Sequence, residues 1–188
     1  MLYLLGRAVF RFIFKVVFRW RVTGREHLPA AGPYLLCANH TSWWDPPLVG
    51  SIVEPKVYFM AKEELFRVPV LGPVIRAWGA YPVKRHSADR KALRRSLELL
   101  EEGKVLGIFA EGTRSRNGRL QKAEGGAAWL ARKSGAPVVP VGIAAPYRLF
   151  KPLQVRIGPP LRLQPGVDVA EASEAIMQAI ASLLPRGE

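Results

Sequence analysis

Six short apolar segments alternate with longer stretches of helical periodicity, and this alternation constrains the fold more than any other feature. Most of the apolar segments are flanked by Gly, Pro or Asn, which is typical of buried strands. Strands that alternate with helices predict an α/β domain with a largely parallel central sheet covered by helices. In such sheets ligands gather at the carboxyl ends of the strands. The expected strands are Tyr34–Ala38, Val57–Ala61, Ala80–Val83, Val105–Phe109, Val138–Gly142 and Val155–Ile157, and the expected helices are Val70–Trp78, Ala88–Glu102, Ala127–Lys133 and Val169–Leu184.

The first twenty residues are apolar and aromatic, but Arg7, Arg11, Lys15 and Arg19 interrupt them every four residues. The uncharged runs are far shorter than the roughly 20 residues that span a bilayer, and the pattern of a signal peptide is missing. A step of four residues advances a helix by only about 40° beyond a full turn. The four cations therefore share one sector, which predicts an amphipathic helix lying in a membrane interface. A helix packed on its own domain, with solvated cations, is the alternative.

The net charge is +13, from 28 Lys and Arg against 15 Asp and Glu. Such an excess predicts an anionic partner, which is a nucleic acid, an anionic membrane surface, or an acidic protein or substrate. A basic surface that serves solubility alone is the alternative. The single cysteine, Cys37, lies in an apolar segment, where we expect it to be buried. No pair of His or Cys has the spacing of a ligand set, so we expect no metal site.

His40 and Asp45 lie in a segment that directly follows the first expected strand. In a helix their side chains would lie about 140° apart, and in a strand they would point to opposite faces, so they meet only if the chain turns. Imidazole suits a general base near neutrality, and a carboxylate on its other ring nitrogen holds the tautomer and stabilises the imidazolium. We expect these two residues to be catalytic, His40 as a general base and Asp45 as the carboxylate that orients it. Asp45 before Pro46 is also typical of a helix N-cap.

In the context Asn-His-Thr-Ser-Trp-Trp-Asp-Pro, this His-x4-Asp pair resembles the first motif of the glycerolipid acyltransferases, specifically the 1-acylglycerol-3-phosphate acyltransferase family. Further segments resemble the later motifs of that family in the expected order, and the resemblance covers roughly residues 25 to 160. These segments are Ala61–Phe66 with Pro69, Gly72, Gly79 and Pro82–Arg85, then Phe109–Ser115, then Val139–Ile143.

Residues 111–115, Glu-Gly-Thr-Arg-Ser, follow an expected strand and should lie at its carboxyl end. Gly112 permits close backbone approach, and the planar guanidinium of Arg114 matches a phosphate with two parallel N–H groups. The resemblance implies that this motif binds the acceptor phosphate. We expect Glu111 to be a buried partner that orients arginine. The expected substrate-binding residues are Glu111, Gly112, Thr113, Arg114, Ser115, Lys84 and Arg85.

One segment departs from the family pattern. Family members often carry basic residues just before the position of Gly126, whereas this chain has Glu124 and Gly125 there. The head-group preference therefore stays open. For Lys62 and Glu64, an ion pair and a contact with ligand are both open.

The resemblance implies transfer of a fatty acyl group from acyl-CoA or acyl-carrier protein to the sn-2 hydroxyl of 1-acylglycerol-3-phosphate. The product is phosphatidic acid, made in phospholipid biosynthesis without a cofactor beyond the acyl co-substrate. An acidic carrier protein would complement the basic surface. The other readings are an acyltransferase for another lysophospholipid or lipid acceptor, and a basic non-catalytic membrane- or nucleic-acid-binding protein.

Two parts of the chain are expected. Residues 1–22 form a membrane-anchoring helix and residues 23–188 form an acyltransferase domain. The protein is expected to be peripheral or monotopic, on the cytoplasmic face of an anionic membrane. We expect no nucleic-acid partner, because no recognition motif accompanies the positive charge.

Overall fold

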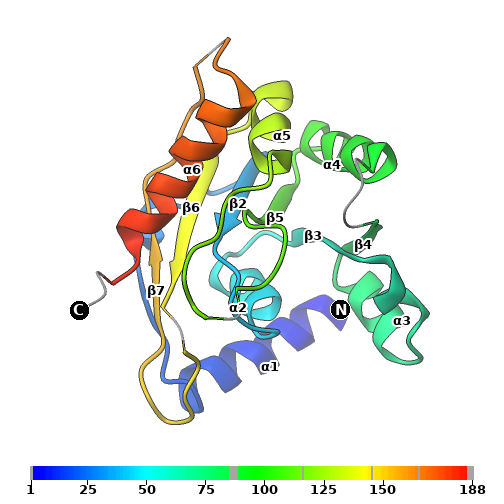
Figure 1. Ribbon diagram of the computed structural model, residues 1–188. Coiled ribbons are helices and arrows are strands. Elements are labelled where there is room, and N and C mark those ends of the chain that lie inside the picture. Colours follow the sequence, from blue (N-terminus) through cyan, green and yellow to red (C-terminus); the bar gives the residue numbers. More distant parts are fainter. Residues whose placement is uncertain (1, 85–88, 116, 145, 165, 186–188) are drawn as a thin grey trace.

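The computed structural model describes residues 2–84, 89–115, 117–144, 146–164 and 166–185. Within these ranges the centre is a seven-stranded sheet with strand order β1-β7-β6-β2-β5-β3-β4 (Figure 1). Neighbouring strands are parallel except β6 with β7. The strands are β1 (Arg21–Thr23), β2 (Tyr34–Ala38), β3 (Val57–Lys62), β4 (Ala80–Val83), β5 (Val105–Phe109), β6 (Val138–Ile143) and β7 (Gln154–Ile157). The helices are α1 (Leu2–Val16), α2 (Asp45–Ile52), α3 (Leu71–Ala77), α4 (Arg90–Glu101), α5 (Gly126–Ser134) and α6 (Val169–Leu183), with short 3-10 turns η1 (Arg25–His27) and η2 (Glu63–Arg67).

Alternation along β2 sorts the two faces of the sheet. Tyr34 and Leu36 pack in the cluster formed with α1 and α2, whereas Leu35 and Cys37 pack in the cluster formed with α4, α5 and α6. Figure 1 shows these two groups of helices on opposite sides of the sheet. All residues of β2 are buried, as expected of a central parallel strand covered on both faces. Cys37 is buried as predicted, and burial raises the pKa of its thiol to about 12.

The predicted α/β fold with a largely parallel sheet is confirmed. Strands β2, β4 and β5 begin and end at the predicted residues, and the other predicted strands and the helices after residue 22 agree within one or two residues at each end. The helix predicted over residues 1–22 is too long, because α1 ends at Val16 and Arg21–Thr23 form β1. Of the predicted helix Ala88–Glu102, residue 88 lies outside the described residues. The sequence pattern does not predict β1, and of α2 it indicates only the start near Asp45 and Pro46. β1 has three residues and pairs with a strand near the far end of the chain, and α2 is too short to show helical periodicity.

The inward side of α1 packs on the domain, and Phe14 is fully buried there. Arg7 and Arg11 donate to backbone carbonyls at the C-terminal end of α2 and pair with Glu54 at 3.1 and 2.8 Å. The last carbonyls of a helix lack partners within the helix, so these arginines satisfy them. The expected single strip of four cations beside a membrane is therefore wrong for Arg7 and Arg11. Lys15 follows Arg7 by eight residues, which places it about 80° further around the helix, on the exposed side.

The outward side of α1 exposes apolar side chains. α1 therefore has two apolar sides, one buried in the core and one facing outward. Among the described residues, no helix is both long enough and apolar enough to cross a bilayer. The exposed apolar residues of α1 are Leu4, Leu5, Val9, Phe12 and Val16.

Candidate active site

His40 lies just beyond the carboxyl end of β2, where neighbouring strands fix its position. The Asn39 side chain donates to the carbonyl of Ile143 at 2.9 Å and accepts the N–H of Ile143 at 2.8 Å, which ties this end of β2 to β6. The imidazole stacks on the ring of Phe109 at the end of β5, with 4.1 Å between ring centroids and 18° between planes. The His40 side chain is 8% exposed. The plane of the imidazole is thus set by the sheet.

Asp45 is fully buried and faces His40 across a tight turn. Its Oδ2 accepts the N–H of His40 Nδ1 at 2.7 Å and the backbone N–H groups of Thr41 and Ser42 at 2.6 and 2.7 Å. The predicted meeting of the two side chains is confirmed. Because Nδ1 donates to a carboxylate, Nε2 is the ring nitrogen that can accept a proton from a substrate.

The expected N-cap role of Asp45 is wrong. Trp44 occupies the N-cap position, Asp45 is the first helical residue, and proline follows within the first turn. The Asp45 carboxylate turns back toward residues 40–42 instead of capping the N–H groups of α2. Proline costs little here, because the first N–H groups of a helix have no partner within it.

Tyr147 belongs to the same constellation, although no sequence signal indicated it. Its hydroxyl donates to Oδ1 of Asp45 at 2.6 Å from the connection between β6 and β7. Burial and then the negative charge of Asp45 raise the pKa of the Tyr147 hydroxyl well above its usual range, so it remains a protonated donor. The two residues are 102 positions apart, and only the fold brings them together.

Glu111 is buried and holds the backbone around His40. One carboxylate oxygen accepts the N–H of His40 at 2.8 Å and the other accepts the N–H of Gln121 at 2.9 Å. Ser115 in turn donates its backbone N–H to the carbonyl of His40 at 2.8 Å, while its hydroxyl donates to Asn117. We expected an arginine beside Glu111; in the described residues its carboxylate accepts backbone N–H groups instead. Glu111 and Ser115 therefore support the position of His40.

Arg114 and Thr113 point away from this buried network. The guanidinium of Arg114 lies 3.7 Å from the ring centroid of Trp43, and Trp43 is 65% exposed. Stacking uses the face of the planar guanidinium and leaves its in-plane N–H groups to meet an anion. Thr113 is exposed next to it. The outer part of the 111–115 segment is thus suited to an anionic head group.

A cavity of about 430 Å³ opens beside His40. Apolar side chains from β3, α4, β5 and α5 form most of its wall, with Met60, Leu93 and Trp129 among them. Gly112 and Glu124 lie at the polar part of the wall. Gly112 has a φ of 65°, which favours glycine, and the carboxyl carbon of Glu124 lies only 2.5 Å from where a Cβ would be, so a larger residue would also displace the Glu124 side chain.

The segments Ala61–Phe66 and Pro82–Arg85 carry four charged residues that the sequence singles out, and those that the structure describes differ in their position relative to the cavity. Lys84 lies on the cavity wall, and its backbone N–H donates to Asp89 at 2.9 Å. Arg85, the other predicted cation, lies outside the described residues. Lys62 and Glu64 form an exposed ion pair at 3.2 Å. Within the described ranges, no group of three or more His, Cys, Asp or Glu side chains forms a potential metal site.

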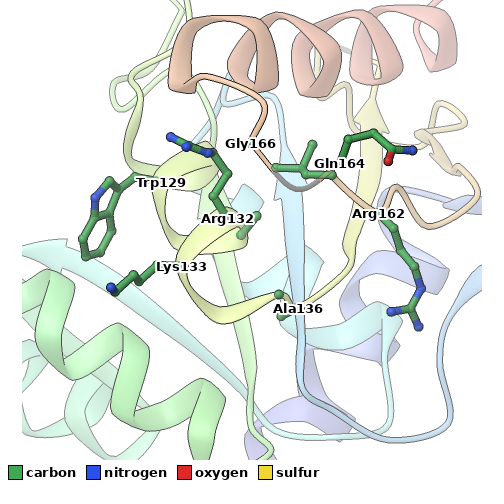
Figure 2. Close-up of a pocket in the computed structure, with 10 residues that line it drawn as sticks. Trp129, Arg132, Lys133, Ala136, Arg162, Gln164 and Gly166 are labelled. Atoms are coloured by element: carbon green, nitrogen blue, oxygen red, sulfur yellow. The ribbon is translucent and has the colours of Figure 1, made fainter.

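A second hollow of about 470 Å³ lies at the C-terminal end of α5 (Figure 2). Figure 2 shows Arg132 and Lys133 on one side and Arg162 on the other. It adjoins the start of β6, whereas His40 lies beside the carboxyl end of that strand. None of the predicted site residues lines this hollow. The cavity beside His40 is therefore the candidate active site.

Comparisons with known proteins agree with this assignment. The profile of the Acyltransferase family matches residues 19–144. A 1-acyl-sn-glycerol-3-phosphate acyltransferase of Bacillus subtilis is 31% identical over 87% of both chains. A lyso-ornithine lipid O-acyltransferase of Pseudomonas aeruginosa is 34% identical over 60% of this chain and 43% of the relative. The crystal structure of the 1-acyl-sn-glycerophosphate (LPA) acyltransferase PlsC from Thermotoga maritima superposes with a TM-score of 0.78 and 28% identity, covering 96% of this chain and 76% of that one.

A largely parallel sheet covered by helices, with a buried His-Asp pair at the carboxyl ends of its strands, defines the class, and the matched profile identifies it. The chain belongs to the Acyltransferase family.

Proposed function

We propose that the protein transfers a fatty acyl group from an acyl thioester to the sn-2 hydroxyl of 1-acylglycerol-3-phosphate, which forms phosphatidic acid. The observation that carries this proposal is the buried His40–Asp45 pair, joined at 2.7 Å beside an apolar cavity. The similar chains from Bacillus subtilis and Thermotoga maritima are named for this activity.

The geometry supports a general-base mechanism. His40 Nε2 takes the proton of the acceptor hydroxyl while the hydroxyl oxygen attacks the thioester carbonyl carbon. Asp45 stabilises the imidazolium that forms. The tetrahedral intermediate then collapses, the C–S bond breaks, and the imidazolium returns its proton to the departing thiolate. The products are an ester and a free thiol, and both side chains return to their starting states.

The polar and apolar parts of the site suit different parts of the substrates. Arg114 and Thr113 supply donors for the acceptor phosphate, and Lys84 adds positive charge from the cavity wall. The apolar wall suits a fatty acyl chain, because binding there removes apolar surface of both the chain and the wall from water. Either acyl-CoA or acyl-carrier protein can be the donor, and the positive surface would attract the acidic carrier.

Glu124 favours a second acceptor. Its carboxylate lies against Gly112 on the cavity wall, and a negative charge there repels a phosphate. A lipid with an ammonium group would instead pair with it, and the Pseudomonas aeruginosa relative is named for a lyso-ornithine lipid. We therefore propose lyso-ornithine lipid as the alternative acceptor for the same acyl transfer.

We further propose that α1 lies on an anionic membrane surface at the cytoplasmic face. Five apolar residues cover its outward side, and Lys15 and Arg19 are exposed near its C-terminal end. Each such cation near an anionic leaflet contributes about 1 kcal/mol. Two other segments near the ends of α1 also expose apolar residues. These are Val70 and Leu71 at the start of α3, and Leu149 and Phe150 in the connection before β7. Figure 1 shows α3 beside the N-terminal end of α1 and the β6–β7 connection beside its C-terminal end.

Purified protein with 1-oleoylglycerol-3-phosphate and either acyl-CoA or acyl-carrier protein tests the reaction. We expect phosphatidic acid from the wild type and none from His40→Ala. Lyso-ornithine lipid in the same assay tests the alternative acceptor. No product from either acceptor with either donor would overturn the proposed function.

Flotation with anionic vesicles tests the membrane contact. Removing α1 would expose the pocket that holds Phe14, so point substitutions are the cleaner experiment. We expect the Leu5→Asp, Phe12→Asp double variant to stay at the bottom of the gradient while it still acylates detergent-dispersed acceptor. Ala175→Asp with Gln178→Asp adds the same charge at exposed positions on α6, across the sheet, and should float like the wild type. Equal flotation of both double variants would contradict the proposal.

A further inference from the structure

The Asp45 carboxylate receives its hydrogen bonds unevenly. Three donors converge on Oδ2, and all of them belong to residues 40–42 of the same turn. Among the described residues, Oδ1 has one donor, the hydroxyl of Tyr147 at 2.6 Å. The turn therefore places one oxygen of the carboxylate, and Tyr147 places the other.

This division matters because a carboxylate held at one oxygen can still rotate. Rotation would move the lone pair that faces His40 Nδ1 and would loosen the imidazole on its opposite side. Asp45 is fully buried, so an Oδ1 without a donor would also seek another partner. A second fixed donor prevents both movements.

Tyr147 is itself held rigidly. Its ring packs edge-on against Phe18, with centroids 5.5 Å apart and planes at 88°. The β6–β7 connection that carries Tyr147 is tied to the end of the α1 segment, because Phe150 donates its N–H to the carbonyl of Val17 at 2.7 Å and Leu153 donates to Phe18 at 3.0 Å. The ring contact and the backbone that follows Tyr147 therefore hold the hydroxyl in place.

We propose that Tyr147 is a positioning residue for acyl transfer, which acts on His40 through Asp45. Its hydroxyl holds the Asp45 carboxylate in the rotation that keeps Nε2 of His40 directed at the cavity. This role rests on the proposed function. It concerns the rate of the chemical step and not the binding of either substrate, since Tyr147 does not line the cavity.

Tyr147→Phe tests this role, because it removes the hydroxyl and keeps the ring against Phe18. We expect kcat to fall about tenfold to a hundredfold, the range for loss of a hydrogen bond to a charged group. KM for both substrates should stay within about twofold. Tyr34→Phe is the matched control: this tyrosine is fully buried, and its hydroxyl has no hydrogen-bond partner among the described residues. It should keep wild-type kcat.

A double-mutant cycle separates positioning from general support of the fold. If Tyr147 acts through Asp45, then Tyr147→Phe should cost little further activity in an Asp45→Asn background. A full additional loss of activity there would overturn the proposal. So would a kcat of Tyr147→Phe within about twofold of the wild type, or a loss that appears in KM.

A measurement without turnover keeps this test apart from the proposed function. The proton on Nδ1 of His40, shared with a carboxylate, should give a far-downfield proton resonance in the wild type that His40→Ala lacks. We expect Tyr147→Phe to shift or broaden this resonance and Tyr34→Phe to leave it in place. An unchanged resonance in Tyr147→Phe would overturn the positioning role, even if the wild type acylates another acceptor.

Discussion

The two halves of the site are held in different ways. His40 and Asp45 are buried, and their side chains are fixed by hydrogen bonds from the turn, from Tyr147 and by the ring of Phe109. Arg114 instead rests on Trp43, which is 65% exposed, and the neighbouring Thr113 is exposed as well. One half is a network inside the protein and the other is a surface.

The difference teaches which part of the task requires rigidity. A general base must keep its proton-accepting nitrogen within hydrogen-bond reach of a reacting hydroxyl, so its orientation has to be set before substrate arrives. A phosphate is bound largely by charge and offers several acceptor oxygens, so its binding requires less exact placement than proton transfer does. We therefore expect changes in the buried half to act on kcat and changes in the exposed half to act on KM.

The largest effect is expected for His40→Ala. Without a general base, the initial rate of phosphatidic acid formation at saturating substrates should fall about a thousandfold or more. Circular dichroism should show an unchanged fold, because the ring lines the cavity at the end of β2 and its loss enlarges that cavity. A rate within about tenfold of the wild type would place the base elsewhere.

Asp45→Asn should follow, with kcat lower by about a hundredfold to ten-thousandfold. The amide oxygen would take the place of Oδ2, where it accepts Nδ1–H of His40 and the N–H groups of Thr41 and Ser42, and the amide nitrogen would face the hydroxyl of Tyr147. The imidazolium that forms on His40 then faces a neutral amide instead of a carboxylate, so the transition state loses the stabilisation that the negative charge supplies. Asp168→Asn is the control, because Asp168 caps α6 by accepting the N–H of Glu171 and asparagine caps equally well. Equal kcat of Asp45→Asn and Asp168→Asn would contradict the expectation that changes in the buried half of the site act on kcat.

Arg114→Ala should raise KM for the phosphate acceptor about tenfold to a hundredfold, because a charged hydrogen bond is lost. The change in kcat should be smaller. Arg114→Lys keeps the charge and loses the planar fork, so its KM for the acceptor should lie between those of the wild type and Arg114→Ala. Initial rates over a range of acceptor concentrations measure both constants. A fall in kcat at unchanged KM would show that Arg114 belongs with the buried half.

Trp43→Leu is expected to have the smallest effect. An exposed cation–π contact contributes about 0.5–1 kcal/mol, so KM for the acceptor should rise about twofold to fivefold. The same kinetic series measures it. A rise as large as that of Arg114→Ala would mean that the indole itself contacts the acceptor.

The sequence by itself determined the layered α/β fold, most strand boundaries and the pair His40–Asp45. These follow from local information. Apolar segments such as Tyr34–Ala38 must be buried on both faces, and a turn is the one way in which residues five apart after a strand can meet. The outward apolar side of α1 is equally local in origin, because it is a helical spacing of Leu5, Val9, Phe12 and Val16.

The tertiary structure alone decided several partners. Tyr147 reaches Asp45 from 102 residues away, Glu111 accepts the N–H of His40 from 71 away, and Arg7 and Arg11 turn inward to the end of α2. Each of these contacts satisfies a buried or terminal polar group whose partner is set by how the elements pack. A sequence shows that such groups need partners, but it does not show which distant side chain or N–H the fold will bring to them.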